Sequence, residues 1–594
     1  MRDQVHLKLL SISLCWLSLS CSQGGGSGQS SQSSLSFTEE PAFCSNSVSY
    51  TGGPTVKAHA QFLARQVTAA GLLGPGLAQD IKFAEVEVIN SSGSRVQCGT
   101  TDSTGLISLP LPPGAGQYAL RVYSRALNNN YNVSVLNNPQ QNLPYKIQTD
   151  FAVTPSTTNL SVNLPVAPFD STLEGGAFNI MDQIYLANQF IRSNSTCNTL
   201  GSICTPFTVA PTVRAYWTPG LSPYSYYGNA STALSFYSKS DDPNAGIRRG
   251  LYIQGGINGD VNCSDTDHFD NSVILHEYGH FLEDVYGKSD SPGGSHNGNA
   301  IIDPRLAWSE GWSNFFQTAV TNTPVYRDTI GNSSCTGGTF LGVNLNIETA
   351  VSGQDKMPVG TTMGEGVYRE LSVSRTLWDT MDNTGVDGGA GLGFALLWKT
   401  FSDSINGFHS TEVHFRNLGR FNQFLRDTVA SFWSSKLSAF DSALAAEYQF
   451  ASTSAYAQHL TPQPSGACTM SLQGVADSYS MGQNIINQFK SNQFYEIQYD
   501  GSYATITLAY SGAGTPSDLD LYLFKENYVY EDSASILRSS VHPYPELSGT
   551  GYESIDLSGL QPGTFMLNVR VNTSHLGQPS NFTLSTNSGA RLCP

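Results

Sequence analysis

The stretch SVILHEYGHFLEDVYG, residues 272–287, contains two histidines and a glutamate at a spacing that could do chemistry. His276 and His280 stand four positions apart, and Glu277 follows the first of them. On a helix, residues four apart share one face, so the two imidazoles could reach one metal ion. Glu277 reaches the same space from the next position, where a general base would stand. The alternative is a core helix with incidental histidines.

A third ligand decides between these two interpretations. Residues 302–320 read IDPRLAWSEGWSNFFQTAV, and Asp303 followed by proline predicts the start of a helix. Glu310 is the lone acid on the apolar helix that follows, and a carboxylate in such a setting must be paired, protonated or metal-bound. With His276 and His280 it would give a site with one position open for water, the catalytic arrangement for zinc.

The two motifs, HEYGH and then SEGWSNFF, resemble those of the gluzincin metallopeptidases, the thermolysin-like class. The second motif is especially similar to the E-G-W-S-D-F-F of fungalysin-type enzymes. The resemblance implies a zincin fold in which His276, His280 and Glu310 bind zinc and Glu277 is the general base for a zinc-activated water. It covers the two motifs closely and the rest of the central unit loosely. The metzincin class is excluded, because its glycine and third histidine are missing here.

The chain departs from this family at the residue that supports a ligand. Asn314 stands where the family commonly has an aspartate, one turn after the third ligand. An amide oxygen can accept a hydrogen bond from an imidazole but lacks the charge that raises ligand basicity, so we expect a lower zinc affinity.

The resemblance also implies a donor that stabilises the oxyanion, from a later helix. The segment GEGVYRELSVSRTLWD suggests Tyr368 for this role, with His409 as the alternative, and either residue could instead serve packing or lie at the surface. His296, in the loop between the two motifs, could contact substrate, compete as a ligand or lie in solvent. We expect the last.

The first residues predict export. Arg2 and Lys8 precede an apolar run over residues 9–19, which is the layout of a secretory signal. The run is too short to span a bilayer. Cys21 and the flexible string after it resemble a bacterial lipoprotein signal, although Ser18 stands where that motif usually has a leucine. We expect a bacterial outer-membrane or cell-surface lipoprotein, with ordinary cleavage and secretion as the alternative.

Composition limits the partners. The chain has 594 residues, too many for one core, and a formal net charge of −17 with 13% charged residues. Nucleic acid, a polyanion, would be repelled. We expect a monomer that binds a protein or peptide substrate, and membrane contact only through a lipid on Cys21.

The pattern of strands and helices predicts a multidomain chain. An N-terminal all-β sandwich, a central mainly helical (α+β) zincin domain and a C-terminal all-β jelly-roll-like domain are expected. The predicted boundaries are a signal peptide at 1–21, a flexible linker at 22–54, the sandwich at 55–165, the catalytic domain at 166–465 and the last domain at 466–594.

In the N-terminal part, FAEVEVI at 83–89 alternates apolar and acidic residues, as a half-buried strand does. Three more short strands and their turns follow it. The order V-x-V, T-D-S-T-G, L-P-x-G-x-Y-x-L-x-V resembles a transthyretin-like regulatory module. In the central part, helices are predicted at 179–193, 270–286, 304–320, 368–381, 391–401 and 415–432.

The C-terminal part returns to period-2 patterns in YATITLAY, SDLDLYLF and GTFMLNVRV. Their order resembles the bacterial pre-peptidase C-terminal domain. Asp518 and Asp520 could help to hold Ca²⁺ there, but we expect them to be solvent-facing strand residues, opposite an apolar face formed by Leu519 and its neighbours.

Eight cysteines follow Cys21, an even number that suggests disulfides in an exported chain. Nearest-neighbour pairing is the simplest connectivity, although spacing does not establish it: 44 with 98, 197 with 204, 263 with 335, and 468 with 593.

The sequence therefore predicts a zinc metalloendopeptidase, with endopeptidase action favoured because no motif for recognising a chain terminus is evident. The alternative is a surface adhesion or carbohydrate-binding protein on a catalytically silent zincin scaffold. The complete set of His276, Glu277, His280 and Glu310 favours the enzyme.

Overall fold

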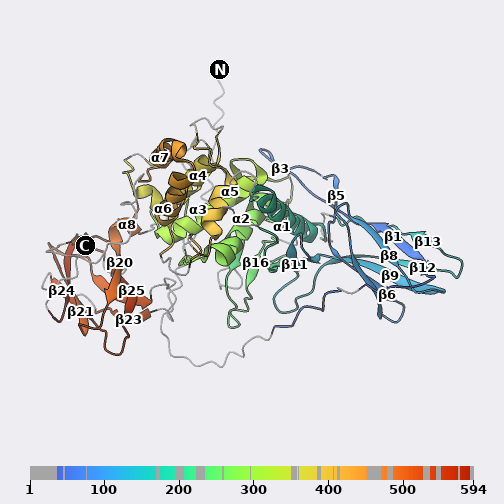
Figure 1. The fold of residues 1–594 in the computed structure, drawn as a ribbon, viewed down its shortest axis with the longest axis horizontal. Helices are drawn as coiled ribbons and strands as arrows, with labels where there is room; N and C mark the ends of the chain where they lie inside the picture. The colour runs from blue at the N-terminus through green and yellow to red at the C-terminus, as the bar shows by residue number, and fades with distance from the viewer. Residues whose placement is uncertain are drawn as a thin grey trace, which may run out of the picture.

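The computed structural model describes residues 37–588, with gaps. The gaps are 45–46, 75, 169–173, 196–206, 222–233, 257–259, 295, 333, 337, 349–356, 359, 384–388, 406, 411–414, 451–469, 478–485, 526–535, 543–549 and 573–575. The predicted signal peptide and Cys21 lie outside the described residues. The described chain is mixed α/β. Figure 1 shows N-terminal strands at one end, helices in the middle and C-terminal strands at the other end.

Two sheets form most of the N-terminal part. One has the strand order β13-β1-β8 and the other β12-β9-β6-β7. The strands are β1 (Thr55–His59), β6 (Glu85–Asn90), β7 (Arg95–Thr100), β8 (Leu106–Pro110), β9 (Gly116–Tyr123), β12 (Lys146–Val153) and β13 (Asn159–Ser161). Strands β6 to β9 confirm the four strands predicted from alternation. Two more pairs of short strands follow β1 in the chain, β2 (Gln61–Leu63) with β5 (Ala78–Asp80) and β3 (Val67–Thr68) with β4 (Gly71–Leu72).

A five-stranded sheet, in the order β10-β11-β14-β16-β15, belongs to the central part. Its strands are β10 (Arg125–Leu127), β11 (Asn132–Leu136), β14 (Val213–Tyr216), β15 (Phe236–Ser238) and β16 (Gly250–Tyr252). Strands β10 and β11 come from the range that the sequence assigned to the N-terminal sandwich. They pair with the central sheet instead, since β11 runs parallel to β14 with Val133 opposite Val213.

The six predicted helices are all present. They are α1 (Glu174–Asn194), α2 (Asn271–Leu282) with the π-helical turn η3 (Glu283–Gly287), α3 (Pro304–Thr321), α4 (Glu370–Met381) after the turn η4 (Glu365–Tyr368), α5 (Phe394–Ser402) and α6 (Leu418–Phe432). The turn η5 (Ser434–Lys436) and helix α7 (Leu437–Ala446), which the sequence did not predict, follow. A hairpin of β17 (Val325–Ile330) and β18 (Phe340–Asn346) comes after α3.

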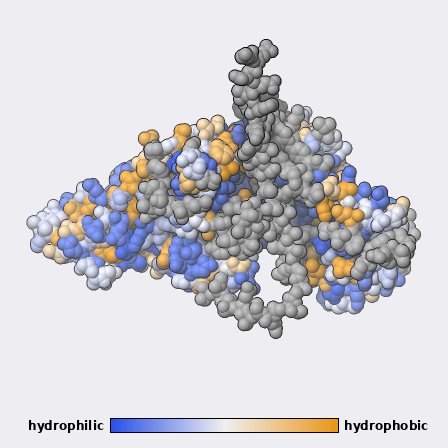
Figure 2. Space-filling view, turned by 180° about the vertical axis from the view of Figure 1, so that it is seen from behind, coloured by the Kyte–Doolittle hydropathy of each residue, from blue (hydrophilic) through white to orange (hydrophobic). Residues whose placement is uncertain are grey.

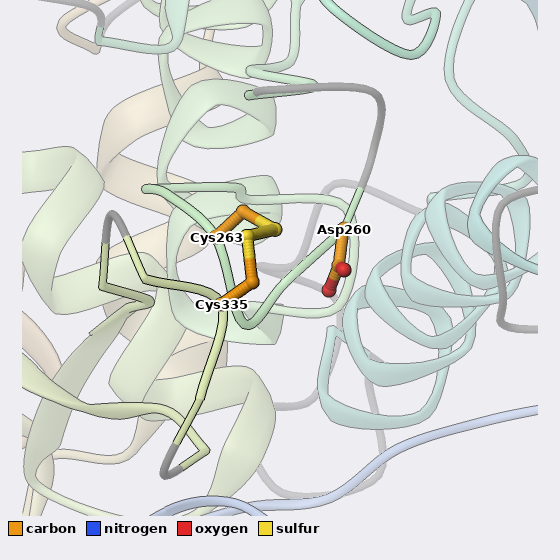
Figure 3. A group of neighbouring side chains, drawn as sticks. All are labelled: Asp260, Cys263 and Cys335. Carbon is orange, nitrogen blue, oxygen red and sulfur yellow. A yellow bond between two sulfur atoms is a disulfide. The ribbon is translucent and has the colours of Figure 1, made fainter.

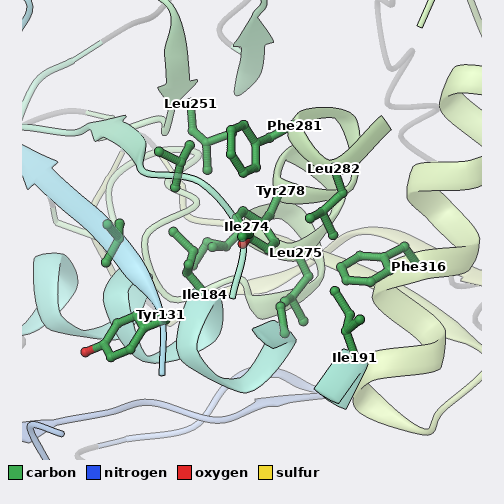
Figure 4. Close-up of a cluster of buried hydrophobic side chains, with 14 of the residues drawn as sticks. Tyr131, Ile184, Ile191, Leu251, Ile274, Leu275, Tyr278, Phe281, Leu282 and Phe316 are labelled. Carbon is green, nitrogen blue, oxygen red and sulfur yellow. The ribbon is translucent and has the colours of Figure 1, made fainter. Parts of the chain in front are cut away.

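Helix α2 is buried among the other elements. Figure 4 shows Ile274 and Tyr278 of α2 between Ile184 of α1, Leu251 of β16 and the region of α3. These side chains belong to one continuous cluster of buried apolar residues that also includes the N-terminal sheets. The helix that carries the two histidines is therefore held by packing on several sides, which fixes the direction of its polar face.

The C-terminal part consists of two four-stranded sheets around their own apolar cluster, in the orders β19-β26-β21-β24 and β20-β25-β22-β23. The short helix α8 (Gln488–Ser491) lies in the chain between the first strand, β19, and the second, β20. The strands are β19 (Met470–Leu472), β20 (Asn492–Tyr499), β21 (Thr505–Gly512), β22 (Leu519–Lys525), β23 (Ile536–Ser540), β24 (Thr550–Asp556), β25 (Gly563–Val571) and β26 (Ser580–Thr586).

The expectation that Asp518 and Asp520 face solvent is wrong. Their exposed fractions are 0% and 3%. The reason is that the second face of this sheet is also covered, by an apolar cluster in which Tyr522 and Phe524 join Phe415 of the central part.

Two of the four suggested disulfides are confirmed, Cys44–Cys98 and Cys263–Cys335. Figure 3 shows the second of them, with Asp260 close by. The other two suggested pairs involve residues outside the described part of the chain.

On the face seen in Figure 2, hydrophilic and hydrophobic residues are interspersed. Among the helices that the structure describes, none has both the length and the apolar character needed to cross a bilayer.

Candidate metal centre

Helices α2 and α3 carry the predicted ligands, and small residues let them approach closely. Gly279 lies between the two histidines, and a Cβ atom on it would stand 3.0 Å from the Cα of Ser313 on α3. The start of α3 is fixed by Asp303, whose side chain accepts a hydrogen bond from the backbone N–H of Arg305. The register between the helices therefore follows from local sequence features.

The structure brings His276, His280 and Glu310 together, with their ligand atoms within 4.8 Å of one another. The Nε2 atoms of the two histidines are 3.1 Å apart, and they lie 3.2 and 3.3 Å from Oε2 of Glu310. Donors about 2.1 Å from one zinc ion at tetrahedral angles are about 3.4 Å from each other. The donor types and the triangle that they form thus fit a zinc ion.

The hydrogen bond to Asn314 sets the tautomer of His276. Asn314 donates its Nδ2–H to Oε1 of Glu370 at 2.9 Å, so its Oδ1 atom faces His276, 2.9 Å from Nδ1. An amide oxygen only accepts, and Nδ1 of His276 must therefore be the donor. The lone pair of Nε2 is left free to bind a metal.

A similar chain of contacts supports His280. The hydroxyl of Ser309 donates to Glu283 at 2.5 Å, and its oxygen lies 3.1 Å from Nδ1 of His280. The hydroxyl can thus accept the Nδ1–H of His280, which again leaves Nε2 as a ligand atom. Both histidines are supported by a neutral residue backed by a carboxylate. The sequence predicted neither Glu283 nor Glu370, since neither stands at a motif position.

Glu277 is buried beside the three ligands, with 6% of its surface exposed. Burial raises the pKa of Glu277 and the negative charge of Glu310 adds to the rise, which the neighbouring His276 and His280 only partly oppose. Burial would also raise the pKa of Glu310, but His296, His280 and His276 hold it well below the usual value. The pKa of Glu277 thus lies above and that of Glu310 below the ordinary value of a glutamate.

His296 does not lie in solvent, so the expectation for this loop residue is wrong. Its Nδ1 atom is 2.8 Å from Oε2 of Glu370, and its Nε2 atom is 3.6 Å from Oε1 of Glu310. Burial lowers its pKa, but Glu310 and Glu370 raise it to about 9. The reason for its position is that Glu370 binds both Asn314 and His296, which draws the loop against the ligands.

The contacts of the two predicted oxyanion donors, Tyr368 and His409, involve residues other than the three proposed ligands. The ring of Tyr368 packs against Phe489 with centroids 5.1 Å apart, and its pKa is raised by burial and by Asp303, at the start of α3. The pKa of His409 is lowered by burial, opposed by the backbone of Tyr286 at the far end of η3. Tyr326, which the sequence did not single out, stacks edge-on to His276 with ring centroids 5.8 Å apart.

A comparison with known protein families gives a match over the region of the candidate metal centre. Residues 228–425 match the family described as the Mycolysin C-terminal domain. This match points to secreted, thermolysin-like peptidases. It spans α2, α3 and α4, and so includes all the residues of the candidate centre. No curated protein matches the chain.

A solved structure is similar to part of the chain. It is the pre-peptidase C-terminal domain of collagenase from Bacillus anthracis, with 11% identity over 21% of this chain and 96% of that chain, and a TM-score of 0.14. At that TM-score, the likeness carries no conclusion about this chain.

Proposed function

We propose that the chain is a zinc metalloendopeptidase in which His276, His280 and Glu310 hold the metal. The observation that carries the proposal is the triangle of donor atoms, 3.1 to 3.3 Å on each side, from two imidazoles with free Nε2 lone pairs and one carboxylate. The family match over residues 228–425 supports a peptidase independently of that distance argument.

When bound, zinc would polarise the carbonyl of the scissile bond and make water a stronger acid. Glu277 is proposed as the general base that accepts a proton from the attacking water and passes it to the leaving amine nitrogen. Its buried position supports this role, because a raised pKa makes the protonated carboxyl, which the reaction must pass through, less costly than on an exposed glutamate.

Asn314, Ser309, Glu283 and Glu370 are proposed as positioning residues. Each orients an imidazole or a residue that contacts one, and such supporting contacts typically change metal affinity by 10- to 100-fold. Tyr368 stays a candidate oxyanion donor. His296 is a second candidate, supported by an Nε2 atom that faces Glu310 at 3.6 Å.

The remaining parts of the chain are proposed as accessory units. These are a transthyretin-like module before the catalytic unit and a β module after it, with export directed by the first 21 residues and lipid attachment at Cys21 as one route to a membrane surface. The substrate class is protein, with cleavage inside the chain.

The test compares purified wild type with Glu277→Gln, His280→Ala and the exposed control Glu39→Gln. Zinc is measured by elemental mass spectrometry and proteolysis by casein digestion. We expect Glu277→Gln to keep zinc and lose at least about 10²-fold in activity, His280→Ala to lose both, and Glu39→Gln to keep both. Full digestion by a zinc-loaded Glu277→Gln protein would end the proposal.

A further inference from the structure

Arg305, in the first turn of α3, lies where the central part of the chain meets the C-terminal strands. Its side chain is fully buried. Asp303 binds the guanidinium through two contacts, at 3.0 and 2.8 Å. The guanidinium carbon also lies 4.7 Å from the ring centre of Phe415, in the central part, and 5.4 Å from that of Phe494, on β20. A buried cation is costly unless it is paired, so the position of Arg305 depends on these partners.

The two phenylalanines belong to a buried cluster that spans both parts of the chain. Phe415 comes from the segment before α6, and its ring centre lies 4.8 Å from that of Phe494. Tyr522, Phe524 and Met566 of the C-terminal sheet complete the cluster. Phe415 has a φ of 52°, a backbone conformation that is costly for a bulky residue and persists only where the surroundings fix it. The two parts therefore meet in a packed interface with a defined geometry.

A second contact joins the C-terminal part to the segment before α3 and to η4. Figure 1 shows α8 between the C-terminal strands and the helices of the central part. The N–H of Gln488, the first residue of α8, donates to the carbonyl of Ile301 at 3.1 Å. Phe489 packs edge-on against Tyr368, the last residue of η4, with ring centroids 5.1 Å apart. The N–H of Ile302 donates to the carbonyl of Tyr368 at 3.0 Å, so α8 supports two segments that also bind each other.

Both contacts lie at the starts of helices that build the candidate metal centre. Arg305 and Glu310 are on α3, between one and two turns apart. Tyr368 ends η4, and Glu370 begins α4. Glu370 in turn accepts the hydrogen bond from Asn314 of α3. A movement of either helix start would therefore change the triangle of ligand atoms or the hydrogen bond behind it.

We propose that the C-terminal β part, residues 470–586, is a positioning element of the zinc centre. It acts through Phe494, which holds Arg305 at the start of α3, and through Phe489, which holds Tyr368 before α4. The inference rests on the proposed function and goes beyond the accessory role. A module that moved freely on a linker would neither bury Arg305 nor pack against η4.

The test uses the full chain with Glu277→Gln as the parent protein, so that self-digestion cannot interfere. Phe494→Leu keeps apolar bulk at the interface but removes the ring that faces the guanidinium, and Phe489→Ala removes the ring that packs against η4. The two are combined in one interface variant. Phe582→Leu is the matched control, since Phe582 is 2% exposed and Phe494 4%, but Phe582 belongs to the separate apolar cluster inside the C-terminal sheets.

Hydrogen–deuterium exchange is measured on the metal-free proteins, over the starts of α3 and α4. In the interface variant we expect these amides to exchange about five- to thirtyfold faster than in the parent, because their opening no longer has to break the cation–π and ring contacts. Zinc affinity, from competition with a chelator, should fall about tenfold or more. The control should match the parent in both measurements.

Phe489→Ala alone is the second variant if the combined one does not fold, since Phe489 is 38% exposed. It should speed exchange at the start of α4.

Exchange in the metal-free protein separates this inference from the proposed function. If the parent binds no zinc, the proposed function fails, and exchange alone decides whether the interface fixes the two helices. The inference is overturned if the interface variant exchanges like the parent at both helix starts, or if the control speeds exchange there as much. It is also overturned if the parent and the interface variant bind zinc with equal affinity.

Discussion

Glu370 lies behind Asn314, joined to it by a hydrogen bond of 2.9 Å from the Asn314 amide. Because the Asn314 amide also contacts Nδ1 of His276, the Glu370 carboxylate influences His276 indirectly, through Asn314. The sequence alone indicated that an asparagine here weakens the metal site, because it carries no charge. The charge is present, but it comes from the first residue of α4.

This relationship predicts the effect of restoring the family's aspartate. Asn314→Asp would place a second carboxylate against Glu370 in a buried site, so we expect zinc affinity to fall about tenfold or more. Adding Glu370→Gln should reverse most of the loss, since the glutamine can donate to the new aspartate. Competition titration with a zinc chelator measures all three proteins. A gain in affinity for the single variant would contradict the arrangement.

The two candidate oxyanion donors predict different kinetics. His296→Ala and Tyr368→Phe each remove one donor. The variant that lacks the true donor should show kcat lower by about 10²- to 10³-fold with little change in KM and with zinc retained. The geometry favours His296, whose Nε2 atom faces Glu310. Equal, small losses in both variants would leave neither as the donor.

The acids Asp265 and Asp270 predict a pH effect on stability. Their folded pKa values are about 6 and about 8, above the reference value of 3.8. Between about pH 4 and pH 8 these groups bind more protons in the folded protein than in the unfolded chain, so a rise in pH through this range weakens their contribution to stability. The fall in melting temperature from about pH 4 to pH 8 should therefore be smaller in Asp270→Asn than in the wild type. An equal fall in both proteins would contradict the prediction.

Gly279 predicts a packing effect on the metal site. In Gly279→Ala the new Cβ atom meets the Ser313 backbone at 3.0 Å, and neither helix can yield easily, because both are buried. We expect a loss of about 1–3 kcal/mol in the free energy of unfolding and weaker zinc binding. Denaturant melts and zinc titration measure these. Gly74→Ala is the matched control, since its Cβ would meet nothing within 4 Å.

Much of the fold and of the candidate site could be predicted because local pattern decides it. The spacing of His276 and His280 places both on one helix face in any structure that keeps the helix, and the Asp303-Pro304 pair starts α3 as expected. Glu310 could be predicted because an isolated acid on an apolar helix needs a partner.

Other features depend on contacts between distant segments. Nothing near Glu370 in the sequence indicates that it binds Asn314 and His296, 56 and 74 positions away. The alternation around Asp520 is typical of a strand with one face in solvent, but Phe415 from the central part helps to cover that face. Strands β10 and β11 are short, and only their pairing with β14 assigns them to the central sheet.

The Cys263–Cys335 bond spans 72 positions, and His276, His280, Glu310 and Glu277 all fall inside that span. Protein produced where thiols stay reduced would thus lack the covalent loop that contains all four residues of the proposed zinc centre. Protein prepared in an oxidising host and protein prepared in a reducing host should therefore be assayed separately. Inactivity of the protein from the reducing host would not test the proposed site residues, because the disulfide would be missing.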